Sequence, residues 1–503
     1  MKVFSAVQMK EWDQATIQNE SIDSIHLMER AAIKCSEWIL RNISAEKEIL
    51  VFCGKGNNGG DGLCIARILL QHDRRLKTYI LDTQNKSSPD FSANLKRLEK
   101  LSGDIGMIEK SSDFPSIPPS TIVIDALFGY GLSRKADGLA AELIVHVNQS
   151  GAYVISVDVP SGLFTDQSSK GGTIIKANTT LTFQTTKLAF LLGENDPYVG
   201  DVFTLDIALD EKYYTQTPSR FEVVHESLVK SIYRPRKKYS NKGNFGSVVL
   251  IAGSYGMMGA AVLSAKACLR AGAGKLTCYI PGAGYSIMQT TIPEAMCIAD
   301  KEDRYISSFT TDHTFDVYGV GPGLGTHSET INMLEDLLLN ADGPLVIDAD
   351  ALNLLASRKD LLQHIPANSI ITPHPKEFER LFGSSENDFD RLDLALAKAS
   401  ELNIIIILKG YHSFIATPND KGFFNSTGNP GMSTAGSGDV LTGMIAGFLA
   451  QKYSPTQAAM LGAYLHGAAG DIAASKLSQE GMIASDIIKY LPSTFLKLFT
   501  KNS

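Results

Sequence analysis

The sequence predicts a two-domain α/β protein built on parallel sheets. With 503 residues, the chain is too long for one ordinary domain. Short apolar runs alternate with longer segments of helical periodicity, which is typical of parallel sheets covered by helices. A polar stretch at residues 209–220 separates two such series. We therefore expect a first domain at residues 1–212, a linker at 213–220 and a second domain at 221–503.

The first domain should open with two helices and continue as alternating strands and helices. Apolar residues at helical spacing predict the helices, and short apolar runs predict the strands. The expected helices span residues 7–19, 25–41, 63–70, 91–101 and 139–149. The expected strands span residues 48–53, 78–82, 121–126, 153–157, 179–183 and 202–207.

The second domain repeats this rhythm and ends in two long helices. Its expected strands span residues 247–252, 275–280, 317–321, 345–348, 369–372 and 404–409. Its expected helices span residues 260–271, 438–450 and 455–477. In a parallel sheet, ligands bind beyond the carboxyl ends of the strands, so the residues that follow these strands are the candidates for function.

Charge and cysteine content exclude several classes of protein. The net charge of −7, without a long basic tract, argues against a protein that coats nucleic acid or a membrane surface. The six cysteines lack C-x-x-C spacing, which indicates reduced, buried thiols. No apolar run reaches the roughly 18 residues that span a bilayer, and the N-terminus lacks a signal core. We expect a cytoplasmic protein with neither a nucleic-acid nor a membrane partner.

A glycine-rich motif lies between the first expected strand and the following helix. Residues 54–59 (GKGNNG) match G-x-G-x-x-G, and the free N–H groups of such a turn bind phosphate. Asp82 ends the next expected strand, where a ribose-binding acid would lie in a redox enzyme. The neighbouring Asn57, Asn58 and Asp61 are unusual for a redox-cofactor site. The motif therefore predicts a dinucleotide ligand without deciding its role.

Acids also end two later strands of the first domain. Asp125 and Asp158 occupy these positions, and Ser161 follows the second of them. Together with Asn58 they offer oxygen ligands without sulfur or imidazole, which suits a hard cation. Asp158 could act as a general acid or base. For either acid alone, a helix cap or a strand-end turn is an equally good interpretation.

Four stretches of the first domain resemble the NAD(P)H-hydrate epimerases: MERAA, GKGNNGGDG, DALFGYGL and DVPSG. The resemblance covers residues 1–212 and implies a Rossmann-like three-layer sandwich. It implies a potassium ion held by Asn58, Asp125 and Ser161. It also implies a set of residues that contact the hydrated dinucleotide: Asn57, Asn58, Gly59, Gly60, Asp61, Gly129, Tyr130, Gly131, Leu132, Ser133, Arg134, Lys135 and Asp158.

The strongest motif of the second domain precedes its first long C-terminal helix. Gly436, Ser437 and Gly438 leave N–H groups free at the helix start, which predicts an anion hole for a phosphoryl group. Asp439 follows and could accept a proton from an attacking hydroxyl. Lys409, at the end of a strand, would supply a cation for phosphate. The alternative for Asp439 is a structural acid that is favoured by the helix macrodipole.

This domain resembles the ADP- or ATP-dependent NAD(P)H-hydrate dehydratases of the ribokinase-like superfamily. The stretches that carry the resemblance are KGNFGSVVLIAGS, GVGPGLG, VIDADALN, ITPHPKEFERL and NPGMSTAGSGDVLTG. The resemblance implies that the hydrated dinucleotide contacts Ala260, Gly323, His374 and Asp439. It implies that the adenine nucleotide contacts Lys409, Gly410, Tyr411, His412, Ser413 and Gly438. By itself, His374 would be interpreted as a loop histidine.

Together, the two resemblances predict a bifunctional metabolite-repair enzyme. The first domain would interconvert the R and S forms of NADHX and NADPHX, with Asp158 as its catalytic candidate. The second would dehydrate the S form with ADP (or ATP) and Mg²⁺, using Asp439 as the base and releasing AMP and phosphate. We also expect a homo-oligomer. The alternative is a vitamin or sugar-alcohol kinase fused to a nucleotide-binding scaffold domain.

Overall fold

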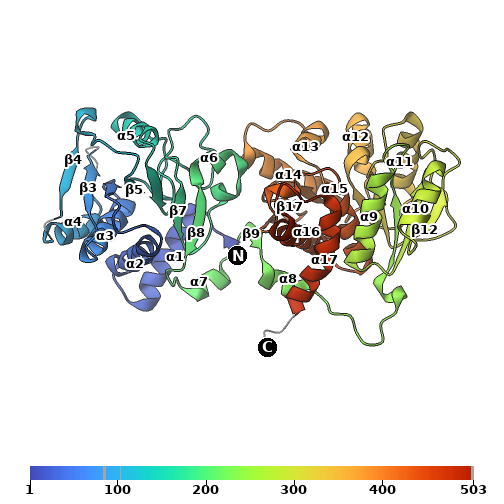
Figure 1. The fold of residues 1–503 in the computed structure, drawn as a ribbon, viewed down its shortest axis with the longest axis horizontal. Coiled ribbons are helices and arrows are strands. Elements are labelled where there is room, and N and C mark those ends of the chain that lie inside the picture. The colour runs from blue at the N-terminus through green and yellow to red at the C-terminus, as the bar shows by residue number, and fades with distance from the viewer. Residues whose placement is uncertain (83–85, 102, 500–503) are drawn as a thin grey trace. The chain divides into compact units, whose positions relative to one another are not determined.

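The computed structural model describes residues 1–82, 86–101 and 103–499 (Figure 1). The chain divides into two compact units, mainly residues 2–219 and mainly residues 220–503. Each unit is built around parallel strands and helices, so the predicted α/β class is confirmed. The stretch expected as a linker overlaps a short helix, α7 (Glu211–Gln216).

The first unit contains a parallel sheet with the strand order β4-β3-β2-β5-β6-β7-β8. Its strands are β2 (Ile49–Cys53), β3 (Leu76–Leu81), β4 (Ile105–Ile108), β5 (Ile122–Ala126), β6 (Tyr153–Val157), β7 (Thr179–Phe183) and β8 (Asp201–Leu205). The two-residue strand β1 (Lys2–Val3) precedes the first helix. The chain order reverses between β2 and β5. In open α/β sheets such a switch point is where ligands bind.

Helices cover both faces of this sheet. They are α1 (Ala6–Glu20), α2 (Ser24–Asn42), α3 (Asn57–Gln71), α4 (Pro89–Glu99), α5 (Gly138–Gln149) and the one-turn α6 (Asp196–Val199), besides α7. Alternate residues of β2 enter different clusters: Val51 packs with α1 to α4, whereas Phe52 packs with α5. Because side chains alternate across a strand, a strand buried on both faces is apolar throughout.

The glycine-rich motif spans the start of α3: residues 54–56 precede the helix, and residues 57–59 begin it. A Cβ on Gly59 would lie 1.6 Å from the carbonyl oxygen of Gly54, and one on Gly62 would lie 2.6 Å from Cβ of Ala126. These glycines therefore allow a close approach of the helix to the ends of β2 and β5. The apolar spacing predicts a helix that starts at residue 63. Because of these close contacts, α3 begins six residues earlier, at residue 57.

The second unit contains a larger sheet, in the order β9-β18-β17-β16-β15-β14-β13-β10-β11-β12. Neighbouring strands are parallel, except that β17 is antiparallel to both β16 and β18. The strands are β9 (Phe221–Val224), β10 (Ser247–Ile251), β11 (Lys275–Ile280), β12 (Met296–Ala299), β13 (Val317–Val320), β14 (Leu345–Ile347), β15 (Ile370–Ile371), β16 (Ile405–Leu408), β17 (Phe414–Ala416) and β18 (Gly422–Asn425).

A tight pair of helices, α9 and α15, packs against the centre of this sheet (Figure 1). The helices of the unit are α8 (Glu226–Ile232), α9 (Met258–Ala271), α10 (Tyr285–Thr291), α11 (Ser328–Asn340), α12 (Ala349–Ser357), α13 (Pro375–Phe382), α14 (Asp388–Leu402), α15 (Ser437–Ala450), α16 (Pro455–Leu477) and α17 (Ala484–Phe499). Gly443 and Gly447 of α15 face α9, where an added Cβ would lie 2.0 Å from the Ser264 carbonyl oxygen and 2.8 Å from that of Cys268. Glycine at these positions therefore fixes the position of α15.

The sequence pattern did not predict the helices α11, α14 and α17, nor several short strands. These strands include β12, β17 and β18, each of three or four residues. Such runs are too short for an alternating pattern to stand out. Within the described ranges, no helix is both long enough and apolar enough to cross a lipid bilayer.

Candidate active sites at the carboxyl edges of the two sheets

In the first unit, Asp125 anchors a network at the carboxyl end of β5. Its carboxylate accepts hydrogen bonds from the Ser161 hydroxyl (2.5 Å), the Ser161 N–H (2.9 Å) and the Ser156 hydroxyl (2.8 Å). Burial raises the pKa of Asp125, and these donors oppose that rise. Asp125 and Ser161, two of the predicted cation ligands, are therefore in direct contact.

Asn58, the third predicted cation ligand, lies beside the same loop. It is 9% exposed, and a Cβ on Gly129 would lie 3.4 Å from its Oδ1. Phe128, adjacent to that glycine, donates its N–H to the Ser161 hydroxyl at 2.8 Å. The Asn58 Nδ2 has no hydrogen-bond partner among the residues that the structure describes. The unpartnered Nδ2 is a hydrogen-bond donor and fits an oxygen of a polar ligand, whereas Oδ1 is the atom that could contact a cation.

Asp158 lies directly after β6 in a left-handed backbone conformation, with φ of 64°. Its carboxylate forms an ion pair with Lys187 at 2.9 Å, and both side chains are almost completely buried. Lys187 also donates to the carbonyl oxygens of Phe183 and Thr185. A non-glycine residue with positive φ is strained, and such strain often occurs at functional sites.

A second carboxylate of this site comes from α1. The Tyr130 hydroxyl donates to Asp13 at 2.8 Å. Burial, with a smaller repulsion from Asp158, raises the pKa of Asp13 to about 6 despite this hydrogen bond. Burial and the charges of Asp158 and Asp13 also raise the pKa of Asp61 well above its usual range. Asp13 and Lys187 were not singled out by the sequence pattern.

The remaining residues predicted for this site differ in exposure. Asn57 is exposed at the start of α3, whereas Gly59 and Gly60 are buried. Most of residues 131–135 is exposed: Gly131, Ser133, Arg134 and Lys135 face solvent, and Leu132 is half-buried. Asp82, which the redox pattern would place on a ribose, is paired with Lys55 of the glycine motif at 2.5 Å.

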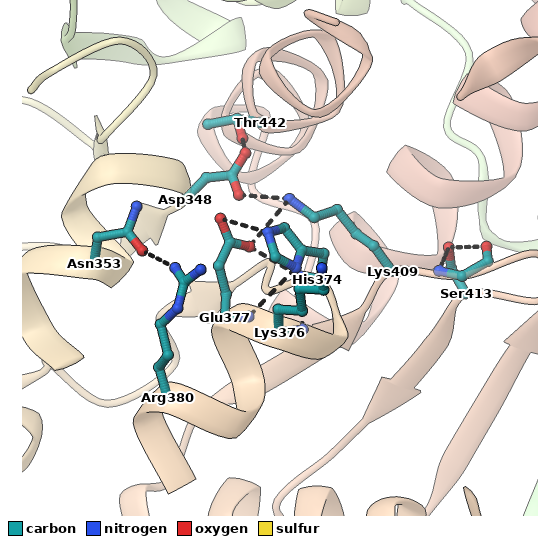
Figure 2. Close-up of polar contacts among 10 residues, drawn as sticks. Asp348, Asn353, His374, Lys376, Glu377, Arg380, Lys409, Ser413 and Thr442 are labelled. Carbon is teal, nitrogen blue, oxygen red and sulfur yellow. Dashed lines mark hydrogen bonds and ion pairs between the residues drawn. The ribbon is translucent and has the colours of Figure 1, made fainter. Parts of the chain in front are cut away.

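In the second unit, Lys409 and Asp348 meet at the start of α15 (Figure 2). Asp348 is 1% exposed and follows β14, and its carboxylate accepts from the Lys409 ammonium and from the Thr442 hydroxyl, each at 2.8 Å. Burial lowers the pKa of Lys409, but the charges of Asp348 and Glu377 outweigh it and leave the pKa raised. Gly438 adjoins this pair, since a Cβ there would lie 3.4 Å from Lys409 Nζ.

Asp439 is half-buried in the first turn of α15. Burial raises its pKa to about 7; the Asp348 charge raises it further, and Lys409 lowers it. A carboxyl group with a pKa near the working pH is suited to general-base catalysis. His466 of α16 supports the same turn, because its Nε2 lies 3.0 Å from the Ser437 carbonyl oxygen.

His374 is the N-cap of α13, in the segment after β15. Its ring Nδ1 accepts from the backbone N–H groups of Lys376 and Glu377, and the backbone N–H of His374 donates to the Glu377 carboxylate at 2.8 Å (Figure 2). Glu377 is buried and lies 3.8 Å from Lys409 Nζ. The His374 Nε2 lies 3.4 Å from the same Glu377 carboxylate, so the structural interpretation of His374 has direct support.

Other residues predicted for the second site form two further groups. Gly323 has φ of 59°, and a Cβ on it would lie 3.0 Å from Cβ of Ala260, so these two positions adjoin. Residues 410–413 form the tight connection from β16 to β17, in which Ser413 hydrogen-bonds Gly410. In that connection Tyr411 is 71% exposed, and the His412 ring lies 3.1 Å from the Asn425 carbonyl oxygen.

Each unit thus gathers polar and ionisable side chains at the carboxyl edge of a largely parallel sheet, which defines a two-domain α/β enzyme. The family model described as YjeF-related protein N-terminus matches residues 24–189, and that described as NAD(P)H-hydrate dehydratase matches residues 248–493. The bifunctional NAD(P)H-hydrate repair enzyme Nnr of Moorella thermoacetica is 36% identical, over 98% of this chain and 96% of that protein.

Two further proteins are similar to this chain. The enzyme of the same name from Escherichia coli is 33% identical, over 88% of this chain and 84% of its own length. The ADP/ATP-dependent NAD(P)H-hydrate dehydratase of Bacillus subtilis, crystallised with ATP and Mg²⁺, is 30% identical over 55% of this chain and 98% of that one, with a TM-score of 0.49. The chain belongs to the family of bifunctional NAD(P)H-hydrate repair enzymes.

Proposed function

We propose that this chain repairs hydrated nicotinamide dinucleotides in two reactions. The first unit interconverts the R and S forms of NADHX and NADPHX. The second dehydrates the S form at the expense of ADP or ATP. Family membership along nearly the whole chain supports both reactions. The observation that carries the dehydration is that Lys409, Asp348 and Asp439 gather at the N-terminus of α15.

In the proposed dehydration, Asp439 takes the proton from the C6 hydroxyl as its oxygen attacks the terminal phosphorus of ADP. AMP leaves, and a phosphate ester remains at C6. The lone pair of the ring nitrogen then expels inorganic phosphate, and loss of a proton from C5 restores the reduced nicotinamide. Phosphorylation replaces hydroxide, which is a poor leaving group, by phosphate. Asp439 is suited to this role because its pKa of about 7 allows it to accept the proton near neutral pH.

Lys409 and the first turn of α15 would stabilise the charge of the transferring phosphoryl group. The nucleotide would contact residues 409–413 and Gly438, and the hydrated dinucleotide would contact Ala260, Gly323 and His374. Bound Mg²⁺ would neutralise phosphate charge. The carboxylates of Asp348 and Glu377, which lie 2.8 and 3.8 Å from Lys409 Nζ, fit the hard oxygen ligands that Mg²⁺ prefers.

In the first unit, the hydrated dinucleotide would lie against residues 57–61, residues 129–135 and Asp158. Asn58, Asp125 and Ser161 would hold potassium, as their oxygen ligands and their proximity support. The ion would place a positive charge beside the bound phosphates or the ring. Lys55 and Asp82 neutralise each other, so Asp82 has no proposed contact with the ribose.

The direct test is to incubate the protein with a mixture of R and S hydrates, with and without ADP or ATP. Recovery of the reduced nicotinamide is followed by its absorbance near ~340 nm. We expect recovery to require the nucleotide, to exceed the S fraction of the mixture, and to release one inorganic phosphate per dinucleotide. A plateau at the S fraction would refute the epimerase activity.

The same assay separates the alternative function. A vitamin or sugar-alcohol kinase would accumulate a stable phosphorylated product and leave the hydrates unchanged. Comparison of ADP with ATP, and of NADHX with NADPHX, under equal concentrations then measures both preferences. ADP is the nucleotide that we expect to be used.

A further inference from the structure

The proposed epimerase site brings together ionisable groups from five separate segments of the first unit. Asp13 comes from α1, Asp61 from α3, Asp158 from the end of β6, Tyr130 from the segment after β5, and Lys187 from the segment after β7. Asp158 and Asp13 are close enough to repel each other, and each also repels Asp61. Carboxyl groups packed in this way cannot all be ionised without cost.

The carboxyl groups of Asp13 and Asp158 have different hydrogen-bonding and charged partners. Asp158 is buried against the ammonium group of Lys187, at 2.9 Å. Asp13 instead accepts a hydrogen bond from a neutral phenol, Tyr130, and is only half-buried. One carboxyl group therefore has a cationic partner and the other does not have one among the contacts described. Two neighbouring acids with such different partners commonly divide the roles of proton donor and proton acceptor.

Epimerisation of a C6 hydroxyl requires those two roles. The C6–O bond breaks as the ring nitrogen's lone pair forms a C6=N1 iminium, and the departing hydroxyl must gain a proton to leave as water. A water molecule then adds to the opposite face of C6 and loses a proton. The sequence is balanced without any oxidant or reductant, because one proton is given and one is taken.

Resting on the proposed epimerase function, we propose that Asp13 donates the proton to the departing hydroxyl and that Asp158 accepts the proton from the water that adds to the opposite face. Lys187 is a positioning residue that holds Asp158 as the acceptor, and Tyr130 positions Asp13. In the reverse reaction the two carboxyl groups exchange roles. Asp13, which lies 41 residues before the glycine motif, thereby becomes a catalytic residue.

The test compares Asp13→Asn with a matched variant on the same helix. Glu11→Gln is suited to this, because Glu11 also accepts a hydrogen bond from a tyrosine, Tyr213, at 2.9 Å but is exposed. We expect Asp13→Asn to slow epimerisation by about 100-fold or more and Glu11→Gln to leave it within about twofold. Asp13→Glu should restore part of the rate. Trp12 and Trp38 both lie in the first unit, so tryptophan fluorescence reports whether each variant is folded.

A second measurement tests the chemistry directly. In water enriched in ¹⁸O, each epimerisation by the full-length protein should place one solvent oxygen at C6, above the rate of spontaneous exchange. Lys187→Met should alter the pH profile of epimerisation, and Tyr130→Phe should move its lower limb. The ionisable groups around Asp13 that influence this pH profile are Tyr130, Asp61, Asp158 and Lys187. If Lys187 and Tyr130 had purely structural roles, their variants would epimerise more slowly, but the pH profile would keep its position.

The outcomes separate the two claims. If the unaltered protein does not epimerise the hydrates, the proposed function of the first unit is wrong. If it does, but Asp13→Asn is folded and retains activity within about threefold, the assignment of Asp13 is overturned. Epimerisation with retention of the original oxygen would overturn the water-addition step, and would indicate that the ring opens at the C6–N1 bond instead.

Discussion

The side chain of Asp439 illustrates how burial prepares a residue for chemistry. Its carboxyl group is half-buried beside Asp348, so its charged form is destabilised and its pKa rises to about 7. An unperturbed aspartate would be ionised at neutral pH but would be a weak base. Lys409 prevents the pKa from rising further, because its ammonium group favours the ionised form. Near pH 7, Asp439 is therefore deprotonated in part of the molecules, and its carboxylate is basic enough to accept a proton.

We expect Asp439→Asn to abolish dehydration and to spare epimerisation. The amide cannot accept the hydroxyl proton, so the dehydration rate should fall by about 100-fold or more. The R and S forms should still interconvert at the normal rate, as measured by chromatography of the two epimers. A dehydration rate close to that of the unaltered protein would show that Asp439 is not the base.

The pH dependence of dehydration follows from the same carboxyl group. A base is active only when it is deprotonated, and the pKa of Asp439 is raised to about 7. We therefore expect kcat/KM for the S hydrate to fall by about tenfold per pH unit below pH 7 and to level off above it. The measurement is a series of initial rates at constant ionic strength and saturating ADP. A profile that is flat between pH 5 and about 7 would contradict this assignment.

The potassium site proposed for the first unit leads to a separate prediction. Asn58, Asp125 and Ser161 present amide, carboxylate and hydroxyl groups, which favour a hard cation. We expect removal of potassium to slow epimerisation and to lower the unfolding temperature reported by tryptophan fluorescence, since a bound ion stabilises the folded unit. Addition of potassium should restore both, whereas lithium at equal ionic strength should not. Unchanged values in both measurements would rule out a potassium site.

At the scale of elements, glycine decides where α3 and α15 lie, the two helices that carry proposed site residues. Gly59 lets α3 begin against the end of β2, and Gly443 lets α15 approach α9 within van der Waals contact. In both cases the proposed site residues lie in the first turns of the helix. Glycine destabilises an isolated helix, so these positions are retained for close packing and not for helix propensity.

Gly443→Ala should therefore be destabilising although alanine favours helices. The new Cβ would lie 2.0 Å from the Ser264 carbonyl oxygen, so α15 must move away from α9. We expect a loss of about 1–3 kcal/mol in the free energy of unfolding, and a corresponding fall in Tm of about 2–4 °C per kcal/mol. Gly259→Ala is the matched control, because nothing lies within 4 Å of its added Cβ in α9. A Tm for Gly443→Ala equal to that of the control would contradict the close-packing argument.

At the scale of the whole molecule, each unit carries its own site and its own core. The core clusters of the first unit contain residues from α1 to α5, whereas the core cluster of the second contains α9, α15 and α16. Separate cores explain why a loss of one activity should leave the other intact. They also agree with two family models that match separate parts of the chain.

Self-association is the remaining prediction for the whole molecule. The family resemblance suggests a homo-oligomer, so light scattering coupled to gel filtration should give a mass that is a multiple of the 54.4 kDa chain. A mass that stays at one chain at micromolar concentration, with both activities present, would refute it. Dilution series of activity then show whether association matters for catalysis.

Periodicity predicted most of the buried strands and long helices, because each of these elements has a face or a surface that must be apolar. Periodicity failed to predict elements whose bounds depend on close backbone contacts or that are too short to show a pattern. The start of α3 depends on contacts of Gly59 and Gly62 with distant backbone, and β17 and β18 are too short to have a pattern. Gly54, Asp158 and Lys409 were visible in the sequence because each follows a strand directly, and Asp125 because it lies near the end of one.

The amino-acid sequence by itself determined the α/β class, the two sets of motifs and the family to which this chain belongs, since these depend on local residue order and on short motifs. Only the tertiary structure decided which charges meet. Asp13 joins Asp158 and Lys187, and Asp348 joins Lys409 and Thr442, across separations in sequence that no periodicity encodes. The physical reason is that burial and neighbouring charge set the reactivity of an ionisable group, and both arise when distant segments pack together.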